Sequence, residues 1–246
     1  MQPWCDVQHL GVVPYGRALK LQAQLVEQRA ANRIGDRLLL LEHPHVITLG
    51  RDSHEEHVLV ERARLAQRGV ELYECGRGGD VTYHGPGQLV AYPILDLRPD
   101  RCDLHRYVRD LERVLLDVLQ SYGVQGHSVP GRTGVWVRPA SARASLPAAP
   151  ATLAGRGPDA NPLTEAKVGA IGVRVSRWIT SHGIALNVCT DLRYFDLIVP
   201  CGLTGSAVAS LEQWVHPAPS VAETATRFAT DFGRVFGRRM RRLGNA

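Results

Sequence analysis

The sequence predicts an α/β (α+β) domain in which strands and helices pack around one core. Short apolar runs such as Leu38-Leu39-Leu40-Leu41 are typical of buried strands, because a run of four is too short for a helix. Apolar residues from Leu104 to Leu119 instead recur three and four positions apart, which is the spacing of an amphipathic helix. With 44% hydrophobic and 22% charged residues, a chain of 246 residues has the composition and length for a sizeable core.

Helices are expected wherever apolar residues keep a helical spacing. The first covers residues 15–31, with Ala18, Leu21 and Leu25 on one face, and the second covers residues 104–119. Ser220 and Glu223 have the spacing of a capping box, which predicts a last helix that runs to about Arg242. Strands are expected at residues 38–41, 45–49, 71–75, 80–84, 88–97, 134–137, 168–175 and 181–188, with a glycine-rich turn at 76–79.

Residues 138–162 differ from the rest of the chain. Eight of them are Ala and five are Pro. Prolines at this density prevent a long helix and a central strand, and few large apolar side chains are present to join a core. The strand patterns on the two sides of the segment are compatible with one sheet. We therefore expect residues 1–246 to form one domain that carries a mobile insertion at 138–162.

The chain shows no signal for membrane insertion or export. No run of about 18 apolar residues occurs, and the start Met-Gln-Pro-Trp lacks the basic and apolar regions of a signal peptide, so we expect a cytoplasmic protein without a membrane partner. The five cysteines are odd in number and contain no Cys-x-x-Cys pair, which favours free thiols. The ten histidines lack zinc-ligand spacing, so no metal is expected.

The net charge of +5 is concentrated near the C-terminus, where five arginines lie between residues 234 and 242. One interpretation is a solvated helix end, because cations are favoured at the negative end of a helix dipole. The other is a surface that docks an acidic macromolecule. No known nucleic-acid reader motif accompanies these arginines, so nucleic acid is not expected as a partner.

Cys201 and Lys167 are the strongest candidates for chemistry. Cys201 stands in Val-Pro-Cys-Gly-Leu-Thr-Gly, and Lys167 begins Lys-Val-Gly-Ala-Ile-Gly. A thiol is a good side-chain nucleophile for holding an acyl group as a thioester, and a nearby lysine cation lowers the pKa of a thiol. An isolated cysteine is more often an inert buried thiol, and an isolated lysine is more often a surface residue. Together with the motifs around them, the two residues predict an acyl-transfer site.

Four segments carry the most specific pattern in the chain. They are Arg77-Gly-Gly-Asp-Val-Thr-Tyr-His-Gly-Pro-Gly-Gln88, Lys167-Val-Gly-Ala-Ile-Gly172, Ser181-His-Gly-Ile-Ala-Leu-Asn187 and Pro200-Cys201-Gly202. In this order they closely resemble the lipoyl(octanoyl) transferase family of the biotin/lipoate protein ligase superfamily, over about residues 5–236. The chain departs from that pattern in the 138–162 insertion and at Gly169, where Ala or Ser is expected.

The resemblance implies a reaction and the residues that carry it out. The family moves an octanoyl group from the phosphopantetheine thioester of acyl carrier protein to a lysine of a lipoyl domain, and the acyl group rests on a cysteine between the two steps. By motif position, Cys201 is the nucleophile and Lys167 its partner. The implied substrate contacts are Arg77, Gly78, Gly79, Asp80, Val81, Thr82, Tyr83, His84, Ala170, Ile171, Gly172, Gly183, Ile184 and Ala185.

The resemblance also implies a fold and partners. The fold is the biotin/lipoate protein ligase type, a central mixed, largely antiparallel sheet flanked by helices. The partners are octanoyl-acyl carrier protein and the lipoyl domains of 2-oxoacid dehydrogenases and of the glycine cleavage H protein, with no cofactor and with a monomeric enzyme. A fatty acyl chain also needs an apolar groove, for which Val81, Tyr83, Ile171 and Ile184 are candidates.

Two other functions remain open from the sequence. An ATP-dependent lipoate or biotin ligase needs nucleotide contacts, and the chain lacks the Gly-Arg-Gly-Arg-Arg-Gly segment of biotin ligases. A non-catalytic module could dock acyl carriers or nucleic acid through the C-terminal arginines. The presence of both Cys201 and Lys167 argues against such a module.

Overall fold

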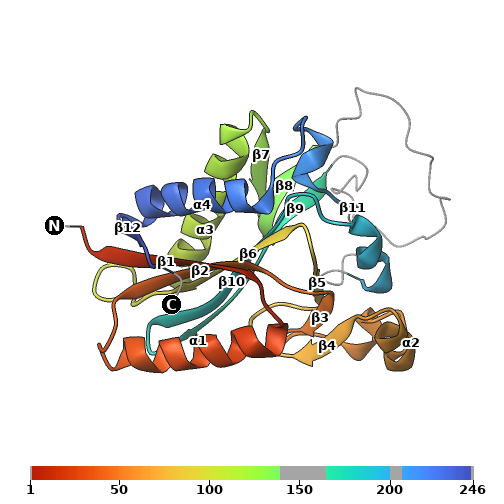
Figure 1. Ribbon diagram of the computed structural model, residues 1–246, viewed down its shortest axis with the longest axis horizontal. Helices are drawn as coiled ribbons and strands as arrows, with labels where there is room; N and C mark the ends of the chain where they lie inside the picture. Colours follow the sequence, from red (N-terminus) through yellow and green to blue (C-terminus); the bar gives the residue numbers. More distant parts are fainter. Residues whose placement is uncertain (1, 139–164, 200–206, 245–246) are drawn as a thin grey trace.

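A nine-stranded sheet forms the centre of the molecule in the computed structural model, which describes residues 2–138, 165–199 and 207–244. Its strands are β1 (Trp4–Val12), β2 (Asp36–Glu42), β6 (Gln88–Ile94), β7 (Gly126–Val129), β8 (Arg132–Val137), β9 (Ala166–Ser176), β10 (Ile179–Asn187), β11 (Ala207–Val208) and β12 (Arg239–Arg242). The strand order is β12-β1-β2-β6-β10-β9-β8-β7, with β11 beside β9 (Figure 1). The pairs from β2 to β7 are antiparallel, whereas β1 is parallel to both β2 and β12 and β11 is parallel to β9. The predicted mixed, largely antiparallel sheet is therefore confirmed.

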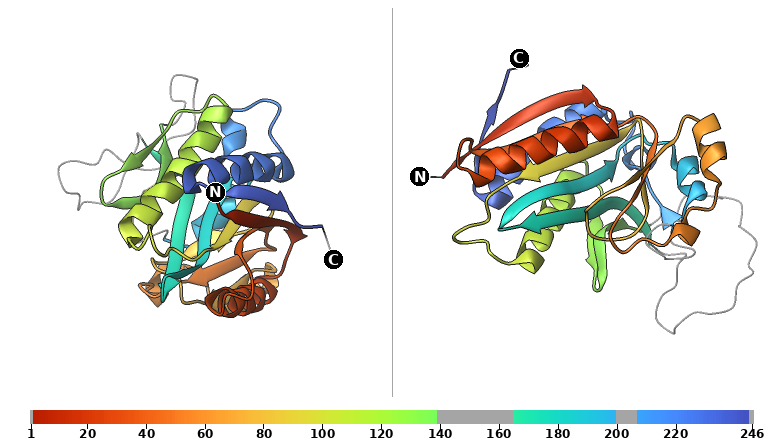
Figure 2. Two further views of the ribbon diagram at one scale, coloured as in Figure 1. Left: turned by 90° about the vertical axis from the view of Figure 1, so that its left-hand side faces the viewer. Right: turned by 90° about the horizontal axis from the view of Figure 1, so that it is seen from below.

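Helices cover both faces of this sheet. Helix α1 (Tyr15–Ala30) lies on one face, and α3 (Leu104–Ser121) and α4 (Val221–Phe236) lie on the other, as the end-on view in Figure 2 shows. Leu38 and Leu40 pack with the residues of α3 and α4, and Leu39 and Leu41 pack with those of α1. Successive residues of a strand face opposite sides of a sheet, so a sheet covered on both faces requires an uninterrupted apolar run.

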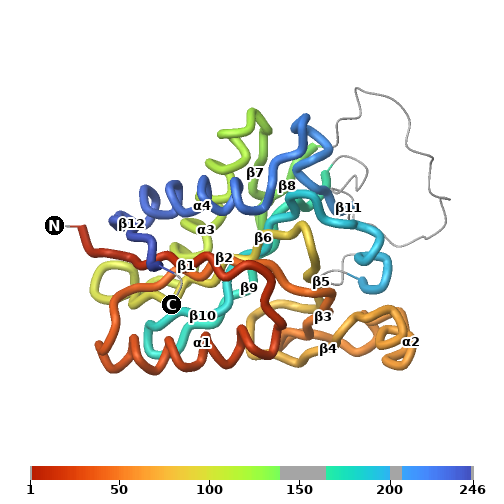
Figure 3. The backbone as a smooth tube through the Cα atoms, in the orientation of Figure 1, coloured from red at the N-terminus to blue at the C-terminus, as the bar shows by residue number. Residues whose placement is uncertain are grey.

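A second, three-stranded sheet has the order β4-β3-β5, formed by β3 (Val46–Leu49), β4 (Glu71–Glu74) and β5 (Thr82–His84). The short helix α2 (Arg62–Gln67) and the 3-10 helices η1 (Glu55–His57) and η2 (Leu192–Leu197) accompany it. The apolar residues of α2 and η2 share one cluster with Ile47 and Tyr83. The loop after β4 reaches the large sheet, because the Gly78 N–H donates to the Val173 carbonyl over 2.9 Å. Figure 3 traces this crossing from the small sheet to the large one. A further 3-10 helix, η4, spans Leu211–Gln213.

Most of the elements expected from the sequence are present. The predicted helices at 15–31 and 104–119 correspond to α1 and α3, and each predicted strand overlaps an observed one. The elements β1, α2, β7, β11 and β12 are not predicted by any clear pattern of apolar residues. The insertion lies outside the described residues except for Arg138, but the strands on its two sides are neighbours, with Val137 opposite Ala166.

The prediction that the last helix runs to about Arg242 is wrong. Ser220 does cap α4, since its side chain accepts the Glu223 N–H, but the helix ends at Phe236. Gly237 follows with φ of 62°, a left-handed conformation that ends helices and favours glycine. Residues 239–242 then form the edge strand β12 along β1. The helix therefore ends before Gly237, directly after the core residue Phe236.

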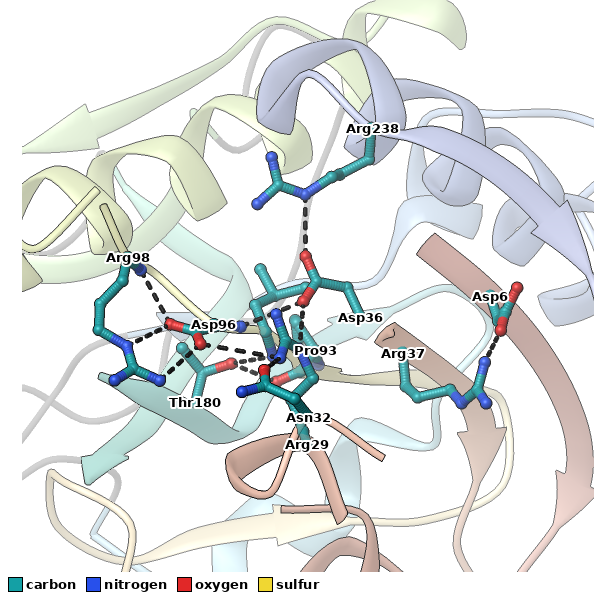
Figure 4. A network of polar contacts seen from close by, with 11 residues as sticks. Asp6, Arg29, Asn32, Asp36, Arg37, Pro93, Asp96, Arg98, Thr180 and Arg238 are labelled. Carbon is teal, nitrogen blue, oxygen red and sulfur yellow. Dashed lines mark hydrogen bonds and ion pairs between the residues drawn. The ribbon is translucent and has the colours of Figure 1, made fainter. Parts of the chain in front are cut away.

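Three of the five C-terminal arginines are ion-pair partners within the fold, a role that neither sequence interpretation included. Arg238 donates to Asp36 over 2.9 Å, Arg241 donates to Asp6 over 2.7 Å, and Arg234 donates to Asp117 over 2.6 Å. The Arg29 guanidinium also donates to the buried Asp36 carboxylate, over 2.9 Å. Figure 4 shows Asp36 with both arginines. These contacts fasten the end of the chain to β1, β2 and α3.

We expect the buried Asp36 carboxylate to be important for stability. Its removal in Asp36→Ala leaves Arg29 and Arg238 partly buried without their shared counter-ion, and we expect the free energy of unfolding to fall by about 3–5 kcal/mol. Denaturant-induced unfolding measures the loss. The matched control is Glu27→Ala, which removes the exposed Glu27–Arg33 pair and should cost at most about 1 kcal/mol. Equal losses in the two variants would contradict the assigned role of Asp36.

Candidate active site

A cavity of about 650 Å³ lies where the two sheets meet. Its walls come from β9 and β10, from the loop that joins β4 to β5, from the first turns of α3, and from Tyr15 at the start of α1. The walls are therefore assembled from segments far apart in the chain. Among the described residues, this cavity collects most of the side chains that carried the sequence prediction.

All but one of the described candidates line this cavity. They are Lys167, Arg77, Gly78, Gly79, Asp80, Val81, Thr82, His84, Ala170, Ile171, Gly172, Gly183, Ile184 and Ala185. Cys201 lies outside the described residues. The structure thus brings together three of the four motif segments.

Tyr83 is the exception, because its ring does not line the cavity. It is fully buried in the cluster beneath the small sheet, stacks on Tyr194 at 5.1 Å between ring centroids, and shares a 2.7 Å hydrogen bond with His45. Thr82 and His84, the neighbours of Tyr83 on β5, do reach the cavity. Alternation along a strand sends Tyr83 to the opposite face, so its expected place in the acyl groove is wrong.

Two loops cross in contact at one rim of the cavity. A Cβ atom built on Gly50 would lie 2.0 Å from the Gly79 carbonyl oxygen, so only glycine permits the crossing. The Arg51 N–H donates to the Arg77 carbonyl over 3.0 Å, and the Gly79 N–H donates to Asp52 over 2.9 Å. The crossing fixes residues 50–52 against residues 77–79.

Arg77 is a buried cation in the cavity wall. Its guanidinium donates to the Thr48 carbonyl over 2.7 Å, to the Thr48 hydroxyl over 2.9 Å and to the Gly78 carbonyl over 3.2 Å. These acceptors are neutral, and within the described ranges no carboxylate forms an ion pair with the Arg77 guanidinium. That charge contributes, after burial, to the lowered pKa of His182.

Three histidines beside the cavity are neutral near pH 7. Burial and then His43 lower the pKa of His84 from 6.5 to about 3, burial and then Arg77 lower that of His182 to about 4, and burial lowers that of His43 to about 4. His43 Nδ1 contacts the Val13 carbonyl, which only accepts, so Nδ1 carries the proton and Nε2 accepts from Tyr92. The rings of His84 and His182 therefore line the cavity as polar groups without charge.

A buried hydrogen-bond chain connects His84 to the strand that bears Lys167. His84 Nδ1 lies 2.6 Å from Gln88 Oε1, and Gln88 Nε2 donates to Asn187 Oδ1 over 2.9 Å. Asn187 Nδ2 donates to the Ala209 carbonyl over 2.9 Å, and the Ala209 N–H donates to the Lys167 carbonyl over 2.9 Å. These hydrogen bonds thus connect three motif segments to one another and to Ala209, which follows β11.

Lys167 lines the cavity from β9. Its Nζ lies 4.8 Å from the centroid of the buried Trp136 ring, on which Arg132 also stacks at 3.9 Å. An aromatic face attracts a cation, which holds the ammonium group near the ring. The departure at Gly169 has a local reason, since a Cβ there would lie 2.8 Å from a methyl group of Leu115.

The described residues on the two sides of residues 200–206 lie beside the cavity. The Val199 N–H donates to the carbonyl of the cavity residue His57 over 2.8 Å. The chain is described again from Ala207, which pairs with Ala166, while Val208 pairs with Lys167. His57 itself is oriented by a 2.6 Å contact between its Nδ1 and Asp80.

Several cavity residues were missed from the sequence. Tyr15, Arg51, His57 and Tyr92 line the cavity but belong to none of the candidate contacts. His182 lies inside the quoted motif and lines the cavity as well, so its position in the motif was the available signal. Within the described part of the chain no cluster of three or more His, Cys, Asp or Glu residues could hold a metal ion, and no helix is long and apolar enough to cross a membrane.

Solved structures place this architecture in the fold class of lipoate and biotin protein ligases. A bipartite lipoate protein ligase from Thermoplasma acidophilum superposes with a TM-score of 0.68 at 16% identity, over 98% of this chain and 88% of that one. A biotin protein ligase from Aquifex aeolicus, solved with biotin and ATP, superposes with a TM-score of 0.52 at 12% identity, over 94% and 70%. At such identities the likeness shows the fold alone, and it confirms the fold expected from the motifs.

Sequence comparison narrows this class to one family. The octanoyltransferase of Acidobacterium capsulatum is 50% identical over 238 residues, which cover 93% of this chain and 89% of that protein. The octanoyltransferase of Solibacter usitatus is 45% identical over 232 residues, which cover 94% and 93%. Residues 14–233 match the family described as the lipoyl protein ligase A/B catalytic domain, and the chain belongs to this family.

Because these three histidines are neutral in the folded protein, we expect the free energy of unfolding to fall in acid. In the unfolded chain each would bind a proton below about pH 6.5, whereas in the folded protein His43, His84 and His182 remain neutral until about pH 3–4. The unfolded state therefore binds more protons between these values, and the free energy of unfolding must fall as the pH drops from about 6.5 to about 4. Calorimetric melting over this range measures the fall.

The same measurement on His84→Gln should give a shallower pH dependence, because one of the three groups is gone. His105→Gln changes an exposed histidine and serves as the matched control. An unchanged slope in His84→Gln would contradict the link between this buried ring and acid sensitivity.

Proposed function

We propose that this protein transfers an octanoyl group from a carrier thioester to a lysine side chain of a lipoyl domain. The observation that carries the proposal is the convergence of the described candidate residues, including Lys167, on one cavity. Membership of the lipoyl protein ligase A/B family supports it, as do relatives named octanoyltransferase that align with nearly the whole chain.

Cys201 is the proposed acyl carrier of the enzyme. Its sequence neighbours on both sides are tied to the cavity, through Val199 at His57 and through Val208 beside Lys167. The sulfur attacks the carbonyl carbon of the donor thioester, a new carbon–sulfur bond forms, and the carrier thiolate leaves. In the second step the amine of the acceptor lysine attacks the acyl-cysteine, an amide forms, and the Cys201 thiolate is released.

Lys167 is the proposed proton carrier for both steps. Its ammonium stabilises the Cys201 thiolate before acyl transfer, and it gives a proton to the carrier thiolate that leaves. The neutral amine then accepts the proton that the incoming lysine loses when the amide forms. Contact with the Trp136 ring holds the charged form of the group in the cavity.

The cavity walls suit a short acyl chain. Val81, Ile171 and Ile184 supply apolar surface, and Leu104 and Val108 add to it from α3. The proposed donor is octanoyl-acyl carrier protein, and the proposed acceptors are lipoyl domains of 2-oxoacid dehydrogenases and the glycine cleavage H protein. A solved relative of this fold is described as lipoate-protein ligase A bound with ATP, so an ATP-dependent ligase is the alternative that the assay must separate.

The acyl-enzyme is the direct test of this function. Incubation with octanoyl-acyl carrier protein, without nucleotide, should add the mass of one octanoyl group to the protein, and peptide mapping should place it on Cys201. Cys201→Ala should abolish the gain, and Cys102→Ala, which changes an exposed thiol, should keep it. Octanoate on Cys75 or Cys189, or transfer that requires ATP, would contradict the proposal.

Lys167→Arg tests the proton transfer separately. Arginine keeps a positive charge beside the thiolate but is not deprotonated in proteins, so it cannot accept the proton of the incoming amine. We expect steady-state transfer to fall by about 10²–10⁴-fold, the usual contribution of general acid–base catalysis, while the pH dependence of Cys201 alkylation still shows an activated thiol. Turnover at the level of the unmodified protein would refute the proton role of Lys167.

A further inference from the structure

Among the described residues, four arginine and lysine side chains line the cavity, and Arg51 differs from the other three. Arg77 is buried and bound to Thr48 and to the Gly78 carbonyl. Arg132 stacks on Trp136 and lies 3.7 Å from Glu165, and Lys167 lies over the same indole. The Arg51 side chain is exposed, and among the described residues no hydrogen bond or ion pair engages its guanidinium.

The backbone that carries Arg51 is nevertheless well fixed. Its N–H donates to the Arg77 carbonyl over 3.0 Å, and the next N–H, from Asp52, donates to the Gly79 carbonyl over 3.3 Å. On the other side, Gly50 touches Gly79 so closely that no side chain fits between them. Arg51 is thus a long cationic side chain that projects from a fixed point on the cavity rim.

The carboxylates of the cavity are engaged elsewhere. Asp52 accepts the Gly79 N–H over 2.9 Å, and Asp80 lies 2.6 Å from His57 Nδ1. Neither forms an ion pair with Arg51. The rim therefore presents a guanidinium that an anion from outside the chain can bind.

We propose that Arg51 binds the phosphate group of the phosphopantetheine arm that carries the octanoyl thioester. This inference rests on the proposed function, because that function makes a phosphopantetheine thioester the donor. The arm enters the cavity with its thioester first, so its phosphate group stays nearer the rim. A planar guanidinium with five N–H donors suits the phosphate oxygens, which are the strongest acceptors on the arm.

The contact between Arg51 and the phosphate should affect binding of the donor but not the rate of the chemical step. A contact with the phosphate acts far from the reacting carbonyl, so it strengthens binding of the donor and leaves the chemical step unchanged. Loss of the contact should raise KM without lowering kcat. Because Arg51 is exposed, salt should screen the attraction over about 8–10 Å.

The test compares two donors that differ only in the phosphate group, octanoyl-4′-phosphopantetheine and octanoyl-pantetheine. Arg51→Gln should raise the KM for the phosphorylated donor by about tenfold, equivalent to about 1.4 kcal/mol, and leave the KM for octanoyl-pantetheine unchanged. Arg51→Lys should keep part of the effect, and added salt should shrink it. The matched control is Arg33→Gln, an exposed arginine beyond the far end of α1, which should change neither value.

Two results would overturn the inference. One is an equal change of KM for both donors, which would mean a general effect on the cavity. The other is an effect confined to octanoyl-acyl carrier protein and absent with octanoyl-4′-phosphopantetheine, which would mean that Arg51 contacts carboxylates of the carrier. Equilibrium binding of the two small donors to the Cys201→Ala variant makes the same comparison without turnover. A failure of octanoyl transfer itself would instead show as inactivity of the unmodified protein with every donor.

Discussion

The buried hydrogen-bond chain from His84 through Gln88 and Asn187 to Ala209 is the constraint on which the site depends. Each of its amide groups is enclosed, so a partner out of register would leave a polar group unsatisfied in a medium of low dielectric constant. The chain ties β5, β6 and β10 to the strand after Cys201, and Ala209 in turn binds the Lys167 carbonyl. These paired amide groups therefore help to hold the cavity walls in the observed arrangement.

Much of the fold could be predicted from the sequence because the large sheet is covered on both sides. Full burial requires continuous apolar runs, and these stand out in β2, β6 and β10. Strand β1 was missed because it mixes buried Val7 with half-exposed Gln8 and His9, and its strand conformation depends on β2 and β12 beside it. Residues 239–242 were assigned to a helix by continuity, although Gly237 ends the helix and β1 supplies hydrogen bonds that a local pattern cannot reveal.

In the candidate site, too, some residues could be predicted from the sequence and others could not. Glycine, arginine and histidine at fixed spacings in residues 77–88 were visible as a motif, and the described residues of that motif do gather at the cavity, apart from Tyr83. Strand alternation could have excluded Tyr83, because it lies between Thr82 and His84. Tyr15, Arg51 and His57 could not be found in this way, since each reaches the cavity through tertiary contacts with segments distant in the sequence.

The ion pair between Asp36 and Arg238 joins residues 202 positions apart. A ribosome makes the chain from its N-terminus, so Asp36 emerges long before its second guanidinium partner exists. The same holds for β1, whose neighbour β12 lies at Arg239–Arg242 and is made long after it. Until then one edge of the large sheet is open and a buried carboxylate lacks one of its two guanidinium partners. An open strand edge can pair with other chains, so the nascent protein depends on protection from aggregation during this stage.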